Sequence, residues 1–306
     1  MGRFILKRVV LVIPVLIGVT LLTFMMVHLV PGDPIVVMLG DRATAENVER
    51  LRREFGFDRP LYVQYLDYVW SALQGDLGSS IRTRQPVLDE VLRVFPSTLK
   101  LTAAAVLVAT VVGVSAGMLA ATAKHRIVDF LTMALVLVGI STPTFFSSLL
   151  LILLFSLKLD LLPVAAGSGI KPLILPSVAL AAPAAAVLAR VTRSSLLEEL
   201  RKDYVRTAYA KGLKDRTVMT VHVLKNALIP VVTIIGLQVG GLMAGAVIVE
   251  SVFARPGIGR FAVTSINARD LPAIQGIALV AALIYVTVNL LVDILYGFID
   301  PRIKYR

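Results

Sequence analysis

Six apolar runs, each close to the length of a bilayer-crossing helix, constrain the fold of this chain more than any other feature. A helix needs roughly 20 predominantly apolar residues to cross the hydrocarbon core of a membrane. Hydrophobic residues make up 57% of the 306 residues, whereas soluble domains contain roughly 45–50%. We therefore expect an all-α polytopic membrane protein with six transmembrane helices. The predicted spans are residues 9–30, 98–123, 128–156, 173–190, 228–250 and 275–298.

The distribution of Lys and Arg predicts the orientation of these spans. With both termini in the cytoplasm, the inner segments carry 17 basic residues and the short outer segments carry 5. Cytoplasmic loops hold the excess of positive charge, and loops beyond about 60 residues are left out of such a count. The net charge of +11 is then a topology signal with lipid headgroups as partners, and nucleic acid is not expected. Residues 1–30 are predicted to be a cytoplasmic stub and a retained first span, because a signal peptide has a shorter apolar core.

Residues 31–97 form the longest predicted outer segment, and we expect them to fold into a small helical extracytoplasmic cap. Amphipathic stretches at 44–56, 61–75 and 86–95 predict three helices. Tyr62, Tyr65 and Val69 make an aromatic-rich stripe along the second of them. Two interpretations of this stripe are open: docking of a soluble partner, and packing against the membrane surface or the other spans, which we favour.

The sequence lacks the patterns of an enzyme or of a metal protein. No Lys is followed by Ser or Thr, a pair that a phosphate-binding P-loop requires. The three histidines lie far apart in the sequence and Cys is absent, so neither a zinc-binding helix nor thiolate chemistry is predicted. We expect no catalytic residue, no metal site and no cofactor in this chain.

Glycine pairs at i, i+4 predict close helix packing within the spans, because they let helix backbones approach each other in lipid. Carboxylates near the bilayer midplane, which an ion-driven transporter usually needs, are scarce. An ion-gradient secondary transporter and a membrane scaffold nevertheless stay open as alternatives from other classes. The glycine pairs are Gly113–Gly117 in the second span and Gly236–Gly240 and Gly241–Gly245 in the fifth.

Residues 190–226 join the fourth and fifth spans on the predicted inner side and are dense in charge. Apolar and basic residues recur at helical spacing, and Gly212 is a stop signal for a helix. Two interpretations are open: an amphipathic helix that lies on anionic lipid, and a docking helix for a cytoplasmic protein. An inner segment this long and charged indicates a function, and the residues alone leave both interpretations open.

Several stretches resemble bacterial ABC-importer permeases of the branch that handles dipeptides, oligopeptides, nickel and glutathione. The strongest is TAYAKGLKDRTVMTVHVLKNALIPVVTIIGLQVG at 207–240, which is similar to the cytoplasmic loop and fifth span of that family. The resemblance covers nearly the whole chain. The other stretches are LVPGDP at 29–34, QYLDYVWSALQGDLGSS at 64–80, ARVTRSSLLEEL at 189–200, ESVFARPGIGR at 250–260 and NLLVDILYGFIDPRI at 289–303.

The resemblance implies a type I ABC-importer permease fold. Residues 98–298 would be the permease core, 190–226 its cytoplasmic coupling loop and 299–306 a cytoplasmic tail. The family's Glu-Ala-Ala-x-x-x-Gly motif would end at Gly212, with Arg206 in place of the glutamate. The residues implied to meet an ATPase are Tyr204, Arg206, Thr207, Ala208, Ala210, Lys211, Gly212 and Leu213. The residues implied to form an extracytoplasmic loop or gate are Arg255, Pro256, Gly257 and Gly259.

The resemblance also implies partners. The first is a second homologous permease, most simply in a heterodimer with this chain. The others are two cytoplasmic ATPase subunits that bind ATP and Mg, an extracytoplasmic substrate-binding protein, and membrane lipids. The complex would sit in the bacterial inner membrane and import short peptides, with glutathione or nickel as alternative substrates. No residue pattern in the spans identifies the substrate site.

Overall fold

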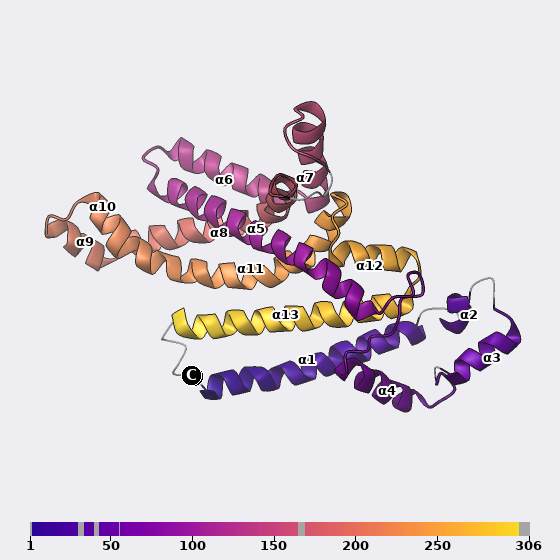
Figure 1. Ribbon diagram of the computed structural model, residues 1–306. Helices are drawn as coiled ribbons and strands as arrows, with labels where there is room; N and C mark the ends of the chain where they lie inside the picture. The colour runs from indigo at the N-terminus through magenta and orange to yellow at the C-terminus, as the bar shows by residue number, and fades with distance from the viewer. Residues whose placement is uncertain (1, 30–33, 40–42, 55, 165–168, 300–306) are drawn as a thin grey trace. The chain divides into compact units, whose positions relative to one another are not determined.

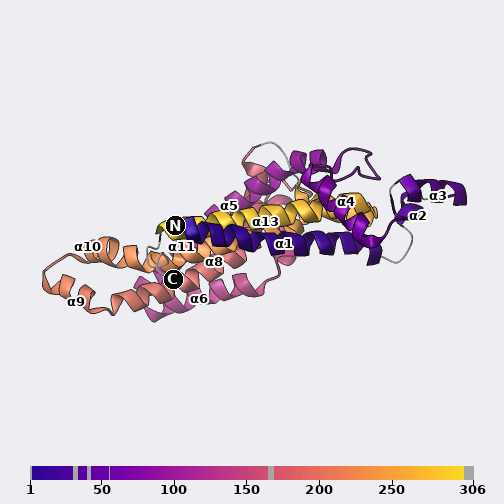
Figure 2. The same cartoon turned by 90° about the horizontal axis from the view of Figure 1, so that it is seen from below.

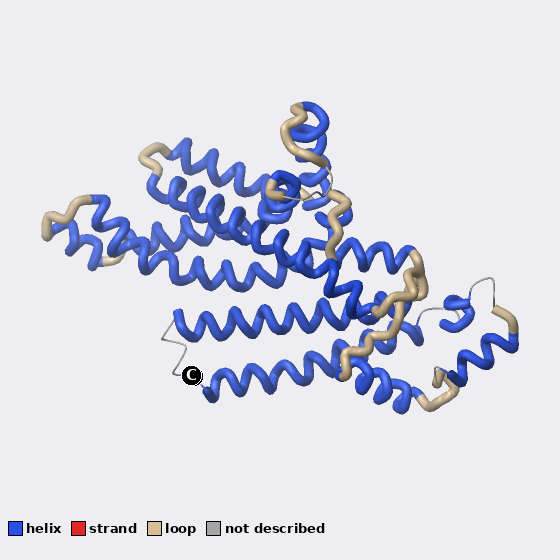
Figure 3. The backbone as a smooth tube through the Cα atoms, in the orientation of Figure 1, coloured by secondary structure: helices blue, strands red, loops and turns tan. Residues whose placement is uncertain are grey.

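The computed structural model describes residues 2–29, 34–39, 43–54, 56–164 and 169–299. Within these ranges the chain is helical and contains no strand, only one isolated bridge between Ser79 and Pro86 (Figures 1 and 3). The expected all-α class is confirmed. Residues 300–306 of the predicted tail and 30–33 of LVPGDP lie outside the described ranges.

Four described helices are long and apolar enough to cross a membrane, by length and composition alone. They include α5 (Val87–Thr122) and α8 (Lys171–Leu200), together with the continuous run Asp215–Val252 that ends in α11 (Leu224–Val252). The fourth is α13 (Leu271–Ile299). Helix α1 (Gly2–Leu29) has a shorter described apolar part, Val10–Met26.

The range 128–156, which we expected to be one continuous span, contains two helices. These are α6 (Arg126–Ser141) and the run formed by α7 (Thr144–Leu151) and the π-helical segment η2 (Ile152–Lys158), which meet at an angle of 107°. The bend lies at Thr142, whose backbone is extended with φ −85 and ψ 121. Because Pro143 follows, its ring disfavours helical geometry at Thr142. The pair is therefore either a broken span or a re-entrant loop.

The chain divides into two compact units, residues 97–255 with 288–306, and residues 1–96 with 256–287. In the first unit α8 is the central helix, and α5, α6, α7 and α11 pack against it. Its Ala-rich sequence, which made it the weakest predicted span, suits a helix that is covered on most sides. Buried core residues include Leu101 and Ala105 of α5, Ala181 of α8 and Val249 of α11.

The first glycine pair has the expected role. A Cβ atom added at Gly113 would lie 2.6 Å from the carbonyl oxygen of Ala185, and one at Gly117 would lie 2.5 Å from that of Ala189. These distances are too short for real Cβ atoms, so only glycine permits the observed approach of α5 to α8.

The glycines of α11 are used differently from the pair in α5. A Cβ atom at Gly245 would lie 3.2 Å from the Leu180 side chain, whereas one at Gly241 would meet nothing within 4 Å. In the pair Gly241–Gly245, only Gly245 therefore lies close to another helix of this unit.

The second unit contains α1 and the predicted outer segment. The latter forms α2 (Pro34–Leu39), α3 (Ala45–Glu54) and α4 (Leu61–Leu73). The helix expected at 86–95 is the beginning of α5, which continues through Pro96. Helix α12 (Ile258–Asn267) and the first part of α13 complete this unit. In both ribbon views that part of α13 runs beside α1 (Figures 1 and 2), and Gln275 donates a hydrogen bond to the carbonyl of Thr23.

A buried carboxylate organises the loop between α4 and α5. Asp270 is 1% exposed and accepts hydrogen bonds from the Ser80 hydroxyl at 2.5 Å and from the backbone N–H of Ile81 at 3.1 Å. It also accepts one from the N–H of Ala273 in the first turn of α13. Asp270 thus caps α13 and fixes the loop to it, because a buried carboxylate needs several donors.

Candidate functional site

The turn between α8 and α11 is the candidate functional site. Most of the expected loop 190–226 consists of helix ends, because α8 continues to Leu200 and the run into α11 begins at Asp215. Between them lies α9 (Asp203–Ala210), followed by α10 (Asp215–Thr217) and the π-helical segment η3 (Val218–Val223). Figure 2 shows α9 and α10 at the far end of α8 and α11.

Local chemistry sets both ends of α9. Lys202 before it is extended, and Asp203 places a negative charge in the first turn, where it favours the helix dipole. Gly212 has φ +77, a left-handed conformation that glycine adopts without strain. The N–H of Gly212 bonds to the carbonyl of Tyr209, and the N–H of Leu213 bonds to that of Ala208. This is a Schellman motif, so Gly212 ends the helix as the sequence predicted.

The inner face of α9 packs into its own chain. Val205 is 2% exposed and Ala208 is 7% exposed, and both belong to a buried cluster with Leu196 of α8 and Val218 and Val223 of η3. Ala227 of α11 belongs to the same cluster, and Met118 of α5 packs against it. Helix α9 is therefore fastened to the spans on both sides of it by apolar contacts.

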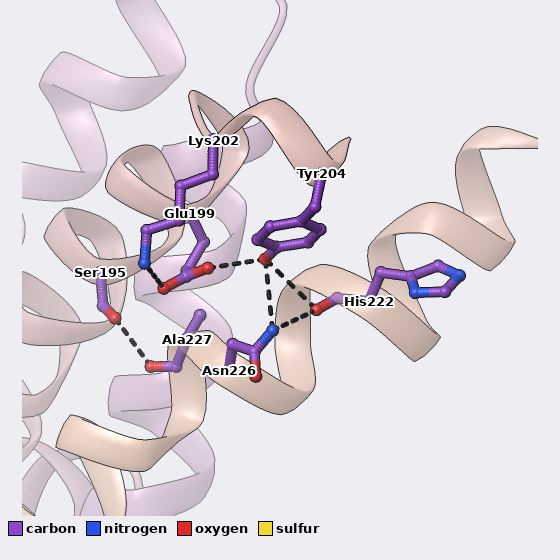
Figure 4. A network of polar contacts seen from close by, with 7 residues as sticks. All are labelled: Ser195, Glu199, Lys202, Tyr204, His222, Asn226 and Ala227. Carbon is purple, nitrogen blue, oxygen red and sulfur yellow. Dashed lines mark hydrogen bonds and ion pairs between the residues drawn. The ribbon is translucent and has the colours of Figure 1, made fainter. Parts of the chain in front are cut away.

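A polar network joins α8, α9, η3 and α11 (Figure 4). The Tyr204 hydroxyl donates to Oε2 of Glu199 at 2.6 Å, and the Lys202 ammonium donates to Oε1 at 2.5 Å. The side-chain N–H of Asn226 donates to the Tyr204 oxygen at 3.3 Å and to the carbonyl of His222 at 3.0 Å. Each partner comes from a different segment of the turn, so the network fixes the direction in which α9 leaves α8.

The charges of the network are complementary near neutral pH. The hydrogen bond to Glu199 raises the pKa of the Lys202 ammonium, so this group stays charged. Burial, followed by the Glu199 hydrogen bond, raises the pKa of the Tyr204 phenol, so it stays a neutral donor. Both directions favour the hydrogen-bonded state shown in Figure 4.

A π-helical segment links the turn to α11. In η3 the backbone hydrogen bonds join residues five apart, instead of four apart as in an α-helix. Such π-helical segments are frequent at functional sites. The His222 carbonyl of η3 accepts the side-chain N–H of Asn226, four residues further on. Because Asn226 also donates to Tyr204, η3 contributes to the arrangement that holds Tyr204.

The outer face of α9 and the following turn is basic, polar and exposed. Tyr209 is 44% exposed and Leu213 is 38% exposed. The Arg206 side chain is 80% exposed and lies 3.8 Å from Asp203, a surface pair that contributes little to stability. The exposed residues of this face are Arg206, Thr207, Tyr209, Ala210, Lys211, Gly212 and Leu213.

Two of the predicted contact residues do not belong to this outer face. Tyr204 is half-buried in the polar network, and Ala208 is buried against η3. Ala208, which the resemblance places among the residues that meet an ATPase, instead contacts residues of its own chain. Tyr209 was missed, although its i+3 spacing from Arg206 places both on one helical face. Glu199 and Asn226 were missed as well, because nothing in the sequence signals a contact between segments so far apart.

The predicted outer loop residues lie where the two units of the chain meet in sequence. Arg255 is 9% exposed and ends one unit, and Pro256, Gly257 and Gly259 begin the other. Gly257 precedes α12, and both glycines are buried. Beside Arg255, the fully buried Glu250 accepts a hydrogen bond from the Thr98 hydroxyl at 2.6 Å. A role for these four residues as a gate stays a prediction.

Sequence comparisons identify the family. Residues 113–305 match the family described as Binding-protein-dependent transport system inner membrane component, and residues 1–102 match the N-terminal part of such a membrane component. The chain is 42% identical to the dipeptide transport system permease protein DppB of Escherichia coli (strain K12), and 100% of both chains is covered. At the same coverage it is 46% identical to the di/tripeptide transport system permease protein DppB of Pseudomonas aeruginosa (strain UCBPP-PA14) and 44% identical to the glutathione transport system permease protein GsiC of Escherichia coli O6:H1.

Two solved structures share the fold. One is a crystal structure of an amino acid ABC transporter with histidines, with a TM-score of 0.55 at 18% identity over 68% of this chain and 94% of that chain. The other is the MetNI methionine ABC transporter in inward-facing conformations, with a TM-score of 0.56 at 16% identity over 69% of this chain and 96% of that chain. Both support the expected permease fold.

The chain belongs to the family of binding-protein-dependent transport system inner membrane components. It is an ABC-importer permease subunit and a multi-pass membrane protein, as the resemblance predicted. Such a subunit is a transport component and not itself an enzyme. Membership of this family sets aside the ion-gradient transporter and the membrane scaffold.

Proposed function

We propose that this permease imports short peptides and that the outer face of α9 is the surface that an ATPase subunit contacts. The observation that carries the proposal is the two-sided character of α9. Its inner face is fixed to α8, η3 and α11 through Val205, Ala208 and the Glu199–Tyr204–Asn226 network, while its outer face is exposed. A force on the outer face is therefore transmitted to both spans.

The mechanism follows from this rigid attachment. Two ATPase subunits bind ATP and Mg and move toward each other, and α9 moves with the ATPase subunit that it contacts. Because α8 and α11 pack along each other and α9 is fastened to both, the movement reaches the centre of the permease. The residues of this chain supply position and rigidity, and the partner subunits supply the chemistry.

The remaining parts of the complex are assigned as follows. Both termini and α9 are cytoplasmic, since this orientation gives the inner segments the excess of basic residues. A second, related permease completes the pathway, most simply as a heterodimer. An extracytoplasmic binding protein delivers substrate on the opposite side, where Arg255, Pro256, Gly257 and Gly259 are the gate candidates.

Short peptides are the proposed substrate class, because the relatives at 42% and 46% identity are named as dipeptide and di/tripeptide permeases. Glutathione is the second candidate, since the glutathione permease is 44% identical over the full length. Nickel is a third, which rests only on the resemblance of the sequence to that branch. Competition between labelled dipeptide, glutathione and nickel ions for uptake by the same complex separates the three.

Charge reversal tests the role of α9. The permease would be reconstituted in liposomes with its second permease, ATPases and binding protein, and uptake of labelled dipeptide and ATP hydrolysis would be measured together. The double variant Arg206→Glu/Lys211→Glu should lose uptake, while Lys225→Glu, which changes another exposed basic residue at the start of α11, should keep it. Unchanged uptake in the double variant would contradict the assignment of α9.

A further inference from the structure

Helix α4 has two faces, and one of them is packed against α1. The Tyr65 hydroxyl lies 2.9 Å from Oγ1 of Thr20, and the Tyr68 hydroxyl lies 3.0 Å from Oγ1 of Thr23. The ring of Phe24 meets that of Tyr65 edge to face, with 5.5 Å between the centroids. Tyr65 and Tyr68 are half-buried, so this face is partly removed from water. Both ribbon views show α4 against the end of α1 (Figures 1 and 2).

The opposite face of α4 is apolar and exposed. Tyr62 is 70% exposed, Leu66 62%, Trp70 65% and Leu73 76%. Their spacing of four, four and three residues puts them in one row on a helix. We call this row the α4 stripe. Asp67 borders it and pairs with Arg59 at 3.1 Å, so charged groups flank the stripe without interrupting it.

The contacts with α1 fix the depth of α4. The α1 residues that it touches, Thr20 to His28, lie at one end of the apolar segment Val10–Met26. At the same level, α1 exposes apolar side chains of its own. These are Leu21, Leu22, Met25 and Met26. An apolar surface at this level of a membrane protein lies at the depth of the hydrocarbon region, and α4 is held beside it.

We propose that the α4 stripe is embedded in the membrane, at the boundary between headgroups and acyl chains. The occupant is lipid, because the stripe lies at the level of the exposed apolar surface of α1 and a water-borne partner would have to enter the bilayer to reach it. Trp and Tyr are enriched at this depth, and an amphipathic helix lies in the interface with its apolar face toward the acyl chains. The embedding rests on family membership and on these contacts; the choice of the outer leaflet rests on the proposed orientation.

This inference refines the prediction from sequence, which joined Tyr62, Tyr65 and Val69 in one stripe. Tyr65 belongs to the face that packs on α1, and Tyr62 belongs to the α4 stripe. Packing against the spans and packing against the membrane are therefore both present, on opposite faces of one helix.

The chain contains one Trp, so the fluorescence of the full permease chain in proteoliposomes reports only on Trp70. Lipids brominated in the upper part of the acyl chain should reduce its emission by about half, as for an interfacial Trp. Aqueous iodide should quench it weakly. The matched control Trp70→Phe/Arg82→Trp moves the probe to an exposed residue of the α4–α5 loop, where iodide should quench and brominated lipid should not.

The outcomes are separable. Quenching of Trp70 by iodide and not by brominated lipid would overturn the proposal and would point to a soluble partner as the occupant. Quenching of Trp70 by brominated lipid supports the embedding of the α4 stripe, whether or not the complex imports peptide. If the complex does not import peptide, only the proposed substrate is wrong. The absence of Cys from the chain allows a second measurement in the whole complex. There Leu66→Cys should react slowly with a water-soluble maleimide, and Arg82→Cys should react fast.

Discussion

Helices α4 and α9 are both short, and tyrosine hydroxyls fasten each of them to a longer helix. In α4 the partners are the neutral hydroxyls of Thr20 and Thr23, whereas in α9 the partner is the carboxylate of Glu199. The outward faces differ more strongly. That of α4 is aromatic and aliphatic, and that of α9 carries Arg206 and Lys211.

The comparison shows that the same arrangement, a short helix fixed to a longer one, suits two environments, the lipid boundary and the aqueous surface. A short amphipathic helix is fixed by its inner face, and its outer face decides what covers it. An apolar outer face at the depth of a span is suited to lipid. A basic, polar face beyond the ends of α8 and α11 is suited to a protein surface, because side chains there are surrounded by water until a partner arrives.

The largest effect is expected from Gly212→Trp. A Trp at φ +77 costs about 1–2 kcal/mol and adds a ring to the surface that we assign to the ATPase. Peptide uptake should fall by about tenfold or more, while ATP hydrolysis persists. Gly212→Asn, which tolerates this backbone conformation, should retain much of the uptake. Normal transport by the Trp variant would count heavily against the role of α9.

A smaller loss is expected from Glu199→Gln. The amide still accepts from Tyr204 but no longer offers a negative charge to Lys202, and charge-assisted hydrogen bonds are about twice as strong as neutral ones. We expect uptake per ATP hydrolysed to fall by about threefold to fivefold. The control is Glu198→Gln, which also removes a negative charge that acts on Lys202 but leaves both hydrogen bonds to Glu199 in place. An equal fall in uptake per ATP hydrolysed in both variants would show that Glu199 has no specific role in coupling.

Two conservative substitutions sharpen the comparison between the helices. Tyr204→Phe and Tyr68→Phe each remove one half-buried hydroxyl that is hydrogen-bonded and should lower the free energy of unfolding by about 1 kcal/mol. Only Tyr204→Phe should also lower the ratio of peptide imported to ATP hydrolysed. Unfolding in detergent measures the first quantity and the reconstituted complex measures the second. A changed ratio in Tyr68→Phe would mean that α4 takes part in coupling.

The smallest effect is expected on the α4 stripe. Leu66→Ser exchanges an apolar side chain at the lipid boundary for a polar one and should lower the free energy of unfolding in a bilayer by about 1 kcal/mol or less. Leu66→Met should be neutral, and peptide uptake should be unchanged in both. If Leu66→Ser abolished uptake without affecting stability, the stripe would be a binding surface for a partner.

The sequence predicted the helical class and a helix in most of the expected ranges, because apolar runs of bilayer length have few alternative structures. It also predicted the close approach at Gly113 and Gly117 and the end of α9 at Gly212, since both depend on local properties of glycine. The bend at Pro143 was missed, although Pro is a known breaker. Tolerance of Pro176 and Pro183 within α8 shows why the presence of proline alone does not decide the outcome.

The candidate site was predicted only in part, for a related reason. The sequence located α9 and its basic residues, but it did not separate the face of Ala208 from the face of Tyr209. That separation depends on which side of α9 meets η3, and η3 itself depends on tertiary contacts such as the one between Asn226 and Tyr204. Contacts across two segments are set by packing and leave no local pattern in the chain.

The most direct test of the central claim is cross-linking from single cysteines, since the natural chain has none. Lys211→Cys directly after α9 and Leu66→Cys on α4 would each be placed in the assembled complex and labelled with a short cross-linker that carries one thiol-reactive group and one photoactivated group. We predict that Lys211→Cys joins this chain to an ATPase subunit, with a yield that changes when ATP is added, and that Leu66→Cys does not. Cross-links from Lys211→Cys to lipid alone, at every nucleotide state, would contradict the account.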